Sequence, residues 1–298
     1  MTLPRNIIDG VCKEYLENNL TIASIAKRYN IHPTTVTKIR KRNNISDREI
    51  YDISVNENYF DKIDSKNKAY WLGFIAGDGH VSELHKNIAI ELGIRDKNHL
   101  QLFLNSLESD HVIKIRNCHN KKTDARYQTC HVSICRSKIV ADLTKHGVGP
   151  NKSKELSISP TIPENLVNHF VRGIIDSDGC WSLNINKYLV FSIVASDINF
   201  ISEIQKLLIG KCNLNVTKII PNPTKKAFTI RYEGNVQTKR IFDYLYEDGG
   251  IRLDRKFQIA NSIFNKDYSI KSEKIDMFSP SDLINFQQLW DNGLLKND

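Results

Sequence analysis

The sequence lacks any apolar run approaching the roughly 20 residues that a membrane-spanning helix needs. Its first ten residues, MTLPRNIIDG, also lack the apolar core of a secretory signal peptide. The six cysteines form no C-x-x-C pair, and no histidines stand at zinc-finger spacing from them, which argues against the common zinc modules. Reduced cysteines fit a cytoplasmic protein, and we therefore expect a cytoplasmic chain without a membrane partner.

The composition is that of a folded protein with a basic excess. Hydrophobic residues make up 40% and charged residues 26% of the 298 positions, unlike a disordered chain, and the length suffices for two domains. The formal net charge is +8. Such an excess is compatible with a polyanionic partner and is informative only where the charge is clustered.

The charge is clustered near the N-terminus, in a domain that we place, with its linker, at residues 1–55. The pattern is typical of three short helices, at residues 5–17, 21–29 and 33–43. Between positions 27 and 42 there are no acidic residues and six basic ones, namely Lys27, Arg28, Lys38, Arg40, Lys41 and Arg42.

The second and third of these helices have the features of a helix-turn-helix. Ala26 is small enough for the helix crossing, Asn30 tolerates a positive φ in the turn, and Val36 and Ile39 form an apolar inner face. The segment resembles the helix-turn-helix domains of resolvases and small regulators. The alternative is a generic three-helix bundle with a solvated charged face. As a helix-turn-helix, it would direct these residues toward a DNA major groove: Thr34, Thr35, Thr37, Lys38 and Arg40.

The main body, residues 65–265, consists of two copies of one unit. One copy opens with KAYWLGFIAGDG and the other with NHFVRGIIDSDG, and their Asp-Gly pairs are 100 residues apart. Later in each copy an acidic residue, Asp96 or Asp197, opens an amphipathic helix, so the register is kept. A repeat this large indicates duplication about a pseudo-two-fold axis.

Each copy has the predicted order helix-strand-strand-helix-strand-strand-helix, which defines an α+β fold. The strand-like runs are HVSEL, NIAIELGI, HVIKIRN and RYQTCHVSIC in the first copy, and WSLNI, YLVFSIVA, NLNVTKII and KAFTIRYEG in the second. We place the first repeat at residues 56–160, the second at 161–265 and a C-terminal extension at 266–298.

The opening helix of each copy carries small residues four positions apart: Gly73 and Gly77, then Gly173 and Ser177. Glycine inside a helix costs about 1 kcal/mol relative to alanine, and close approach of two helix backbones would offset that cost.

Packing of these helices about the pseudo-two-fold axis would bring Asp78 and Asp178 together. Two aspartates at helix C-termini repel each other and face the negative ends of the helix dipoles. A divalent cation would remove both costs. The alternative is that Asp-Gly merely ends each helix.

The motifs WLGFIAGDG (71–79) and VRGIIDSDG (171–179) resemble the LAGLIDADG homing endonuclease family. The resemblance covers residues 60–260 and is to the single-chain form, a monomer often encoded by introns, inteins or phage genomes. It implies two antiparallel four-stranded sheets that form a saddle over the major groove of double-stranded DNA. It also implies cleavage of both strands at a long asymmetric site, leaving short 3′ overhangs.

The resemblance implies the site residues as well. Mg²⁺ would be bound by Asp78 and Asp178, assisted by the backbone carbonyls of Gly77 and Ser177. The sequence departs from the motif at Ala76, where the second copy has Asp176, but the final acid is intact in both copies. We therefore expect cleavage.

Lys152 and Lys256 match the family's lysine after the third helix of each copy. The resemblance implies that each polarises the attacking water or stabilises the charged transition state. The alternative for both is a surface lysine at a helix end.

Base contacts should come from outward-facing strand residues. Period-two alternation selects Lys114, Arg116, Lys218, Thr229 and Arg231. The hairpin loops add side chains better suited to phosphate contacts, namely Lys121, Lys122, Arg126, Lys225 and Lys226. The alternative for each is a merely solvated side chain.

Three other functions compete with a nuclease. The regulator family WhiA combines a LAGLIDADG-like domain with a helix-turn-helix and does not cleave, although there the helix-turn-helix follows the LAGLIDADG part. An RNA maturase would bind intron RNA without metal dependence. A dual role would join cleavage to site binding or self-repression. Both motif aspartates are present, which favours the nuclease.

Overall fold

A computed structural model describes residues 3–16, 22–45, 53–150, 156–222 and 226–264. The chain divides into two compact units, one formed by Met1–Val55 with Glu108–His111 and the other by Asn56–Leu107 with Val112–Asp298. Within the described ranges, none of the helices combines the length and apolar character that crossing a membrane requires. The expected C-terminal extension lies outside these residues.

The N-terminal unit consists of α1 (Arg5–Leu16), α2 (Ile22–Arg28) and α3 (Pro33–Arg42). The three helices enclose a small core of Val11, Tyr15, Ile25, Ala26, Val36 and Ile39. Asn30, between α2 and α3, has a φ of +51°, which is the left-handed conformation expected of this turn.

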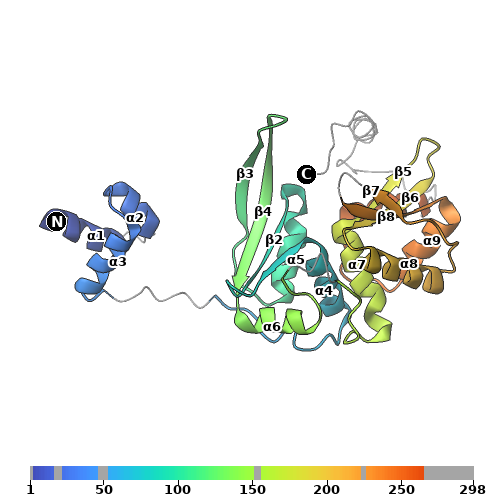
Figure 1. The fold of residues 1–298 in the computed structure, drawn as a ribbon, viewed down its shortest axis with the longest axis horizontal. Helices are drawn as coiled ribbons and strands as arrows, with labels where there is room; N and C mark the ends of the chain where they lie inside the picture. Colours follow the sequence, from blue (N-terminus) through green and yellow to red (C-terminus); the bar gives the residue numbers. More distant parts are fainter. Residues whose placement is uncertain (1–2, 17–21, 46–52, 151–155, 223–225, 265–298) are drawn as a thin grey trace, which may run out of the picture. The chain divides into compact units, whose positions relative to one another are not determined.

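The second unit contains both repeats and has the predicted α+β order (Figure 1). The first repeat runs α4 (Lys66–Asp78), β1 (Gly79–Ser82), β2 (Asn87–Gly93), α5 (Lys97–Ser106), β3 (Lys114–Asn120), β4 (Ala125–Cys135) and α6 (Ser137–Lys145). The second runs α7 (Val167–Asp178), β5 (Gly179–Leu183), β6 (Leu189–Ala195), α8 (Ile198–Cys212), β7 (Ile220–Asn222), β8 (Ala227–Glu233) and α9 (Asn235–Tyr246). A further helix, α10 (Asp254–Phe264), has no counterpart among the expected elements.

Each repeat forms one antiparallel sheet of four strands, in the orders β1-β2-β4-β3 and β5-β6-β8-β7. In the first sheet, Ile88, Ile90 and Val132 are buried on one face, because side chains alternate along a strand. The opposite face carries Glu91 and His131, paired across β2 and β4, and is open to solvent over much of its area.

Two strands begin later than their sequences predict. The expected start of β3 at His111 is wrong because the strand begins at Lys114, and the N–H of His111 bonds to the Ser109 hydroxyl instead of a strand partner. The expected start of β7 at Asn213 is wrong because Asn213 ends α8 in a left-handed conformation. The Thr217 carbonyl then accepts a hydrogen bond from Gln205 rather than from a strand. Lys218 therefore precedes β7 instead of lying within it.

The helices α4 and α7 pack against each other along their length, between the two sheets (Figure 1). A Cβ atom added at Gly73 would clash with the carbonyl oxygen of Phe170, and one added at Gly173 would clash with that of Tyr70. The reciprocal positions of the two glycines show that the helices cross backbone to backbone. This crossing fixes the distance between the two repeats.

The crossing predicts a stability difference between two glycine-to-alanine substitutions. Gly73→Ala should lower the free energy of unfolding by about 1–3 kcal/mol or more, since the two backbones must separate. Gly210→Ala in α8 is the matched control, because an added Cβ there meets no atom within 4 Å. It should raise stability by up to about 1 kcal/mol through helix propensity. Urea unfolding measures both, and equal effects would contradict the crossing.

Candidate functional site

The twin helices α4 and α7 end in Asp78 and Asp178, whose carboxylates are both exposed. In each case the following glycine donates its N–H to the helix, Gly79 to Ile75 and Gly179 to Ile175, and a strand begins at once. A Cβ added at Gly77 would lie 2.9 Å from Oδ2 of Asp178. The carboxylate of α7 is thus held over the end of α4.

This donor set fits a hard divalent cation. Two carboxylates lie beside the backbone carbonyls at the ends of both helices, and oxygen is the ligand that Mg²⁺ prefers. In the part of the chain that the structure describes, no three His, Cys, Asp or Glu side chains gather at one point. The site therefore suits an ion bound by one or two carboxylates and completed by water and phosphate, not an all-protein cage.

Lys256, for which the resemblance implies a role with the attacking water or the transition state, lies against the end of α7. Its side chain is buried, and Nζ donates to the carbonyls of Ile175 at 3.2 Å, Ser177 at 2.9 Å and Gly179 at 2.5 Å. All three N–H bonds of an ammonium are thereby used at the C-terminal end of α7, where a positive charge is favourable. Burial lowers the pKa of Lys256, while Asp176 and Asp78 act in the opposite direction.

Asp176 is the buried centre of a hydrogen-bond network. Its carboxylate accepts from the hydroxyls of Tyr70 at 2.9 Å and Tyr246 at 3.0 Å, and from the backbone N–H of Leu253 at 2.7 Å. Burial raises the pKa of Asp176, and the Leu253 N–H and Lys256 oppose that rise. The acid therefore ties α4, α7 and α9 to the segment that leads into α10.

Arg172, fully buried one turn before Asp176, supports the same region. Its Nη1 donates to the carbonyls of Leu245 and Gly249, each at 2.8 Å. Its guanidinium also lies over the rings of Tyr70 and Tyr246, 5.6 and 6.0 Å from their centroids. Desolvation lowers its pKa, and Asp176 is the main charge that opposes this effect.

An ion pair joins α10 to the first repeat. Nε of Arg255 lies 2.9 and 3.0 Å from the two carboxylate oxygens of Asp96, whose side chain is only 8% exposed. His99, one turn further on, shares a hydrogen bond of 3.0 Å with the Tyr70 hydroxyl. This side of the molecule is therefore filled by polar contacts between the repeats.

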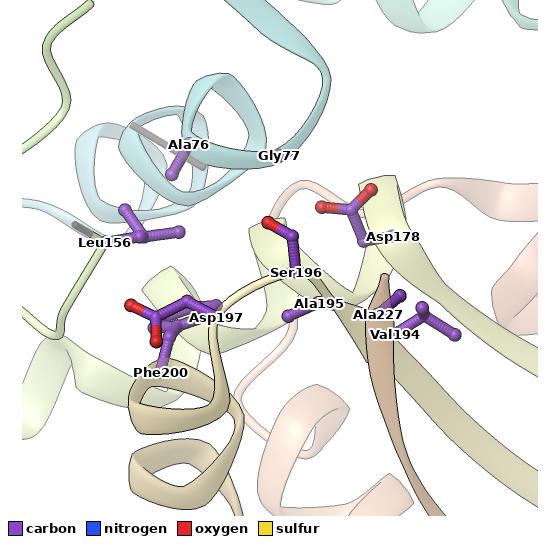
Figure 2. A pocket seen from close by; sticks show the side chains of 10 residues that line it. All are labelled: Ala76, Gly77, Leu156, Asp178, Val194, Ala195, Ser196, Asp197, Phe200 and Ala227. Atoms are coloured by element: carbon purple, nitrogen blue, oxygen red, sulfur yellow. The ribbon is translucent and has the colours of Figure 1, made fainter. Parts of the chain in front are cut away.

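The pseudo-two-fold axis relates the surroundings of Asp176 and Asp96 to a second place in the molecule, which contains a cavity of about 220 Å³ (Figure 2). Ala76 stands there in place of Asp176, and Asp197 in place of Asp96. The lining residues are Ala76, Gly77, Leu156, Asp178, Val194, Ala195, Ser196, Asp197, Phe200 and Ala227. One of the two carboxylates thus opens onto a hollow.

The residues expected to read DNA from the first sheet lie on its open face. Lys114 and Arg116 pair with His131 and Thr129 across β3 and β4, and both are exposed. Arg116 is held by Glu91 at 2.6 Å and contacts His131 at 3.1 Å. The expected phosphate contacts nearby are all exposed: Lys121, Lys122 and Arg126.

In the second repeat the expected DNA contacts are more varied. Arg231 is exposed and pairs with Glu233 at 3.1 Å, whereas Thr229 is half-buried. Lys218 and Lys226 are exposed and lie in connections beside β7 and β8. Lys225 and Lys152 are outside the described residues.

In the N-terminal unit, the expectation that Arg40 points outward is wrong. Its side chain is 4% exposed, its Nη1 donates to the Tyr15 hydroxyl at 2.9 Å, and it lies over the Tyr15 ring. The guanidinium therefore joins α3 to α1 and does not face solvent. Thr34 and Lys38 are exposed, and Thr35 and Thr37 are half-buried.

Several residues of the polar network around Asp176 and Asp96 belong to no recognisable sequence motif. Tyr70, Tyr246 and Arg255 are ordinary residues in the sequence, and only the structure brings them to Asp176 and Asp96. One signal was present: aligning the two motifs places Asp176 opposite Ala76, and an acid in the middle of an apolar helix needs buried partners.

Comparison with solved structures identifies the fold. The homing endonuclease I-WcaI bound to its DNA recognition sequence matches with a TM-score of 0.51 and 15% identity, over 67% of this chain and 91% of the other. The meganuclease I-SmaMI bound to DNA matches with a TM-score of 0.45 and 14% identity, over 78% and 100%. Full-length WhiA from Thermatoga maritima matches with a TM-score of 0.43 and 18% identity, over 80% and 72%.

The chain therefore has the LAGLIDADG fold, as its two motifs predict. No protein-family model matches the sequence. No curated protein matches it either.

The buried histidines predict a pH dependence of stability. Burial lowers the pKa of His99 and of His169 to about 4, against about 6.5 in an unfolded chain. Between these values the unfolded state binds more protons, so stability should fall as the pH drops from about 7 toward 4. Urea unfolding at several pH values measures the slope. His99→Gln with His169→Gln should flatten it, and an unchanged slope would contradict the assignment.

Proposed function

We propose that this protein is a site-specific double-stranded DNA endonuclease that depends on Mg²⁺. It acts as a monomer at a long asymmetric site and leaves short 3′ overhangs. The observation that carries this proposal is the pair of exposed carboxylates, Asp78 and Asp178, brought together by the crossing of α4 and α7. Two like charges at the ends of two helix dipoles form a site that a divalent cation would stabilise.

The chain supplies the positioning for hydrolysis of the phosphodiester bond. Asp78 and Asp178, with the carbonyls of Gly77 and Ser177, provide oxygen ligands for Mg²⁺, which supplies Lewis-acid activation of water and charge stabilisation when bound. Lys256 fixes the Ser177 carbonyl at the end of α7, and its charge offsets the negative end of that helix. We assign Lys256 this holding role because its N–H bonds are directed at carbonyls.

DNA would lie across the open faces of the two sheets. On the first sheet this face offers Lys114 and Arg116, and on the second it offers Thr229 and Arg231. Because Glu91 already orients Arg116, that side chain is preorganised for a bidentate contact to a base. The two faces differ in sequence, so a bound site would be asymmetric.

The N-terminal unit would provide a second contact with DNA as a helix-turn-helix. Thr34, Lys38 and Lys41 are exposed at spacings of four and three along α3, so they share one face of the helix. A generic three-helix bundle would not require exposed basic side chains to lie on α3, which is the second helix of the helix-turn-helix. Whether it binds the same site or serves self-repression is decided by footprinting.

Cleavage of a plasmid library with randomised sites tests the nuclease directly. Wild type should cut one long site with Mg²⁺ and bind without cutting with EDTA. Asp78→Asn and Asp178→Asn should each lower cutting by at least about 100-fold. Asp243→Asn on α9, a half-buried aspartate paired with Lys239, is the control for loss of one carboxylate elsewhere and should cut normally.

Binding of one site without cleavage under any metal would overturn the nuclease proposal in favour of a regulator. Tight binding of structured RNA, independent of metal, would overturn it in favour of a maturase.

The helix-turn-helix proposal is tested by the salt dependence of DNA affinity. Lys38→Ala with Lys41→Ala should weaken binding and lower the slope of log K against log salt, by roughly 0.9 for each lost phosphate contact. Lys13→Ala on α1 removes the same charge from another helix and should leave the slope unchanged. Equal slopes in all variants would contradict the assignment of α3.

A further inference from the structure

The open face of the first sheet carries a cluster of charged and polar side chains that spans three strands. Arg116 on β3 donates from Nη1 to Glu91 on β2 at 2.6 Å, and its Nη2 lies 3.1 Å from Nε2 of His131 on β4. Because a guanidinium can only donate, Nε2 of His131 is the acceptor in this contact. The hydroxyl of Thr129 donates to the other carboxylate oxygen of Glu91 at 2.7 Å. Arg116 is therefore held from two sides.

The held guanidinium can still bind a ligand. The side chains of Arg116 and Glu91 are 50% and 39% exposed. The contacts with Glu91 and His131 occupy two of the five N–H bonds of Arg116, so three remain to donate. Guanine is the base that presents two adjacent acceptors, N7 and O6, in the major groove, and the fork of an arginine side chain matches them. The cluster therefore suits a guanine.

The strand pairings identify the equivalent positions on the second sheet. The glycine that follows each motif aspartate pairs with Ile90 in the first sheet and with Ile193 in the second. The next residues along these strands, Glu91 and Val194, are therefore equivalent. From them a row of paired residues crosses each sheet, through His131 and Lys114 in the first sheet and through Thr229 and Ile220 in the second.

The row on the second sheet presents an apolar surface. Val194 and Ile220 are 42% and 50% exposed, and Thr229 lies between them. Asn222, two residues after Ile220, takes the position that Arg116 has in the first sheet. In place of an ion pair, this surface offers methyl groups. They suit the C5-methyl of thymine, which is the apolar group on a base edge in the major groove.

We propose that Arg116, positioned by Glu91, selects a G·C pair in one half of the DNA target, and that Val194 and Ile220 select an A·T pair at the symmetry-related position of the other half. This inference rests on the proposed placement of DNA across the two sheets and does not require cleavage. Arg116 determines specificity directly, because it donates to the base. Glu91 is a positioning residue, because it acts through Arg116.

The experiment selects duplexes from a randomised library by their binding to the full chain with EDTA, so that no strand is cut. Wild type should recover sites with one G·C pair and one A·T pair at equal distances from the centre. Arg116→Ala should lower the preference for G·C at the first position roughly fivefold or more, as expected for loss of a bidentate contact. Lys121→Ala removes the same charge from the loop of this hairpin and is the matched control. It should weaken binding to all duplexes alike, without changing the base preference.

Two substitutions at Glu91 separate positioning from direct contact. Glu91→Ala removes a negative charge from the DNA-binding face and releases Arg116. Affinity for unrelated duplexes should therefore rise while the preference for G·C falls. Glu91→Gln keeps an oxygen that can accept from Arg116, so it should retain part of the preference. A residue that only supported the fold would not raise the affinity for unrelated DNA when it is removed.

Transfer of the second surface onto the first sheet tests both halves of the inference. Glu91→Val, Lys114→Ile and Arg116→Asn together give the first sheet the side chains of the second, and the preference at the first position should change from G·C to A·T. Val194→Ser with Ile220→Ser should instead relax the A·T preference at the other position. All five side chains are exposed, so these variants should fold.

The outcomes separate this inference from the nuclease proposal. If Arg116→Ala selects the same base pairs as wild type, or the triple variant still prefers G·C at the first position, the inference is wrong. Selection of the expected pairs by wild type without cutting in Mg²⁺ supports the inference and contradicts the nuclease proposal. Cutting at a site whose base pairs these substitutions do not alter contradicts the inference alone.

Discussion

The backbone-to-backbone crossing of α4 and α7 is the contact on which the rest of the second unit depends. Gly73 and Gly173 meet the partner helix reciprocally, and no larger side chain fits at either position. The crossing brings the two helix C-termini together, and each terminus leads directly into the first strand of its own sheet. The separation of the repeats, the placement of the sheets and the meeting of the two carboxylates all follow from it.

The same crossing buries two charged side chains of α7, which need hydrogen-bond partners. Buried ionised groups are costly unless they are paired and hydrogen-bonded. Asp176 and Arg172 are both fully buried in α7. Their partners come from α4, from α9 and from the segment between α9 and α10: Tyr70, Tyr246, Gly249 and Leu253. Among the described residues, this polar cluster connects the two repeats on the side of Asp176. On the other side Ala76 leaves an apolar wall and a cavity.

The duplicated pattern was sufficient to predict most of the architecture. The helix and strand order and the α+β class follow from hydrophobic periodicity repeated at 100 residues, and the turn at Asn30 follows from local chemistry. The starts of β3 and β7 did not follow, because side chains of Ser109 and Gln205 take the place of strand partners. Side-chain hydrogen bonds of this kind to the backbone leave no periodic signal in the sequence.

The candidate site also contains features that follow from the sequence and features that do not. The positions of Asp78 and Asp178 follow from motif spacing alone, since each must end its helix. The burial of Arg40 could not be deduced, because it depends on where Tyr15 of α1 lies. The partners of Lys256 likewise depend on α10, a helix whose packing against β5 has no signature in the repeat.

The central claim is that the two helix ends form one metal site. The most direct test is anomalous diffraction from crystals of the protein–DNA complex grown with Mn²⁺ as a substitute for Mg²⁺. If the two helix ends hold one ion, an anomalous peak is expected at about the 2 Å coordination distance from carboxylate oxygens of both Asp78 and Asp178. The peak should be lost in Asp178→Asn while DNA stays bound. Ordered DNA across the sheets with no peak at these carboxylates would contradict it.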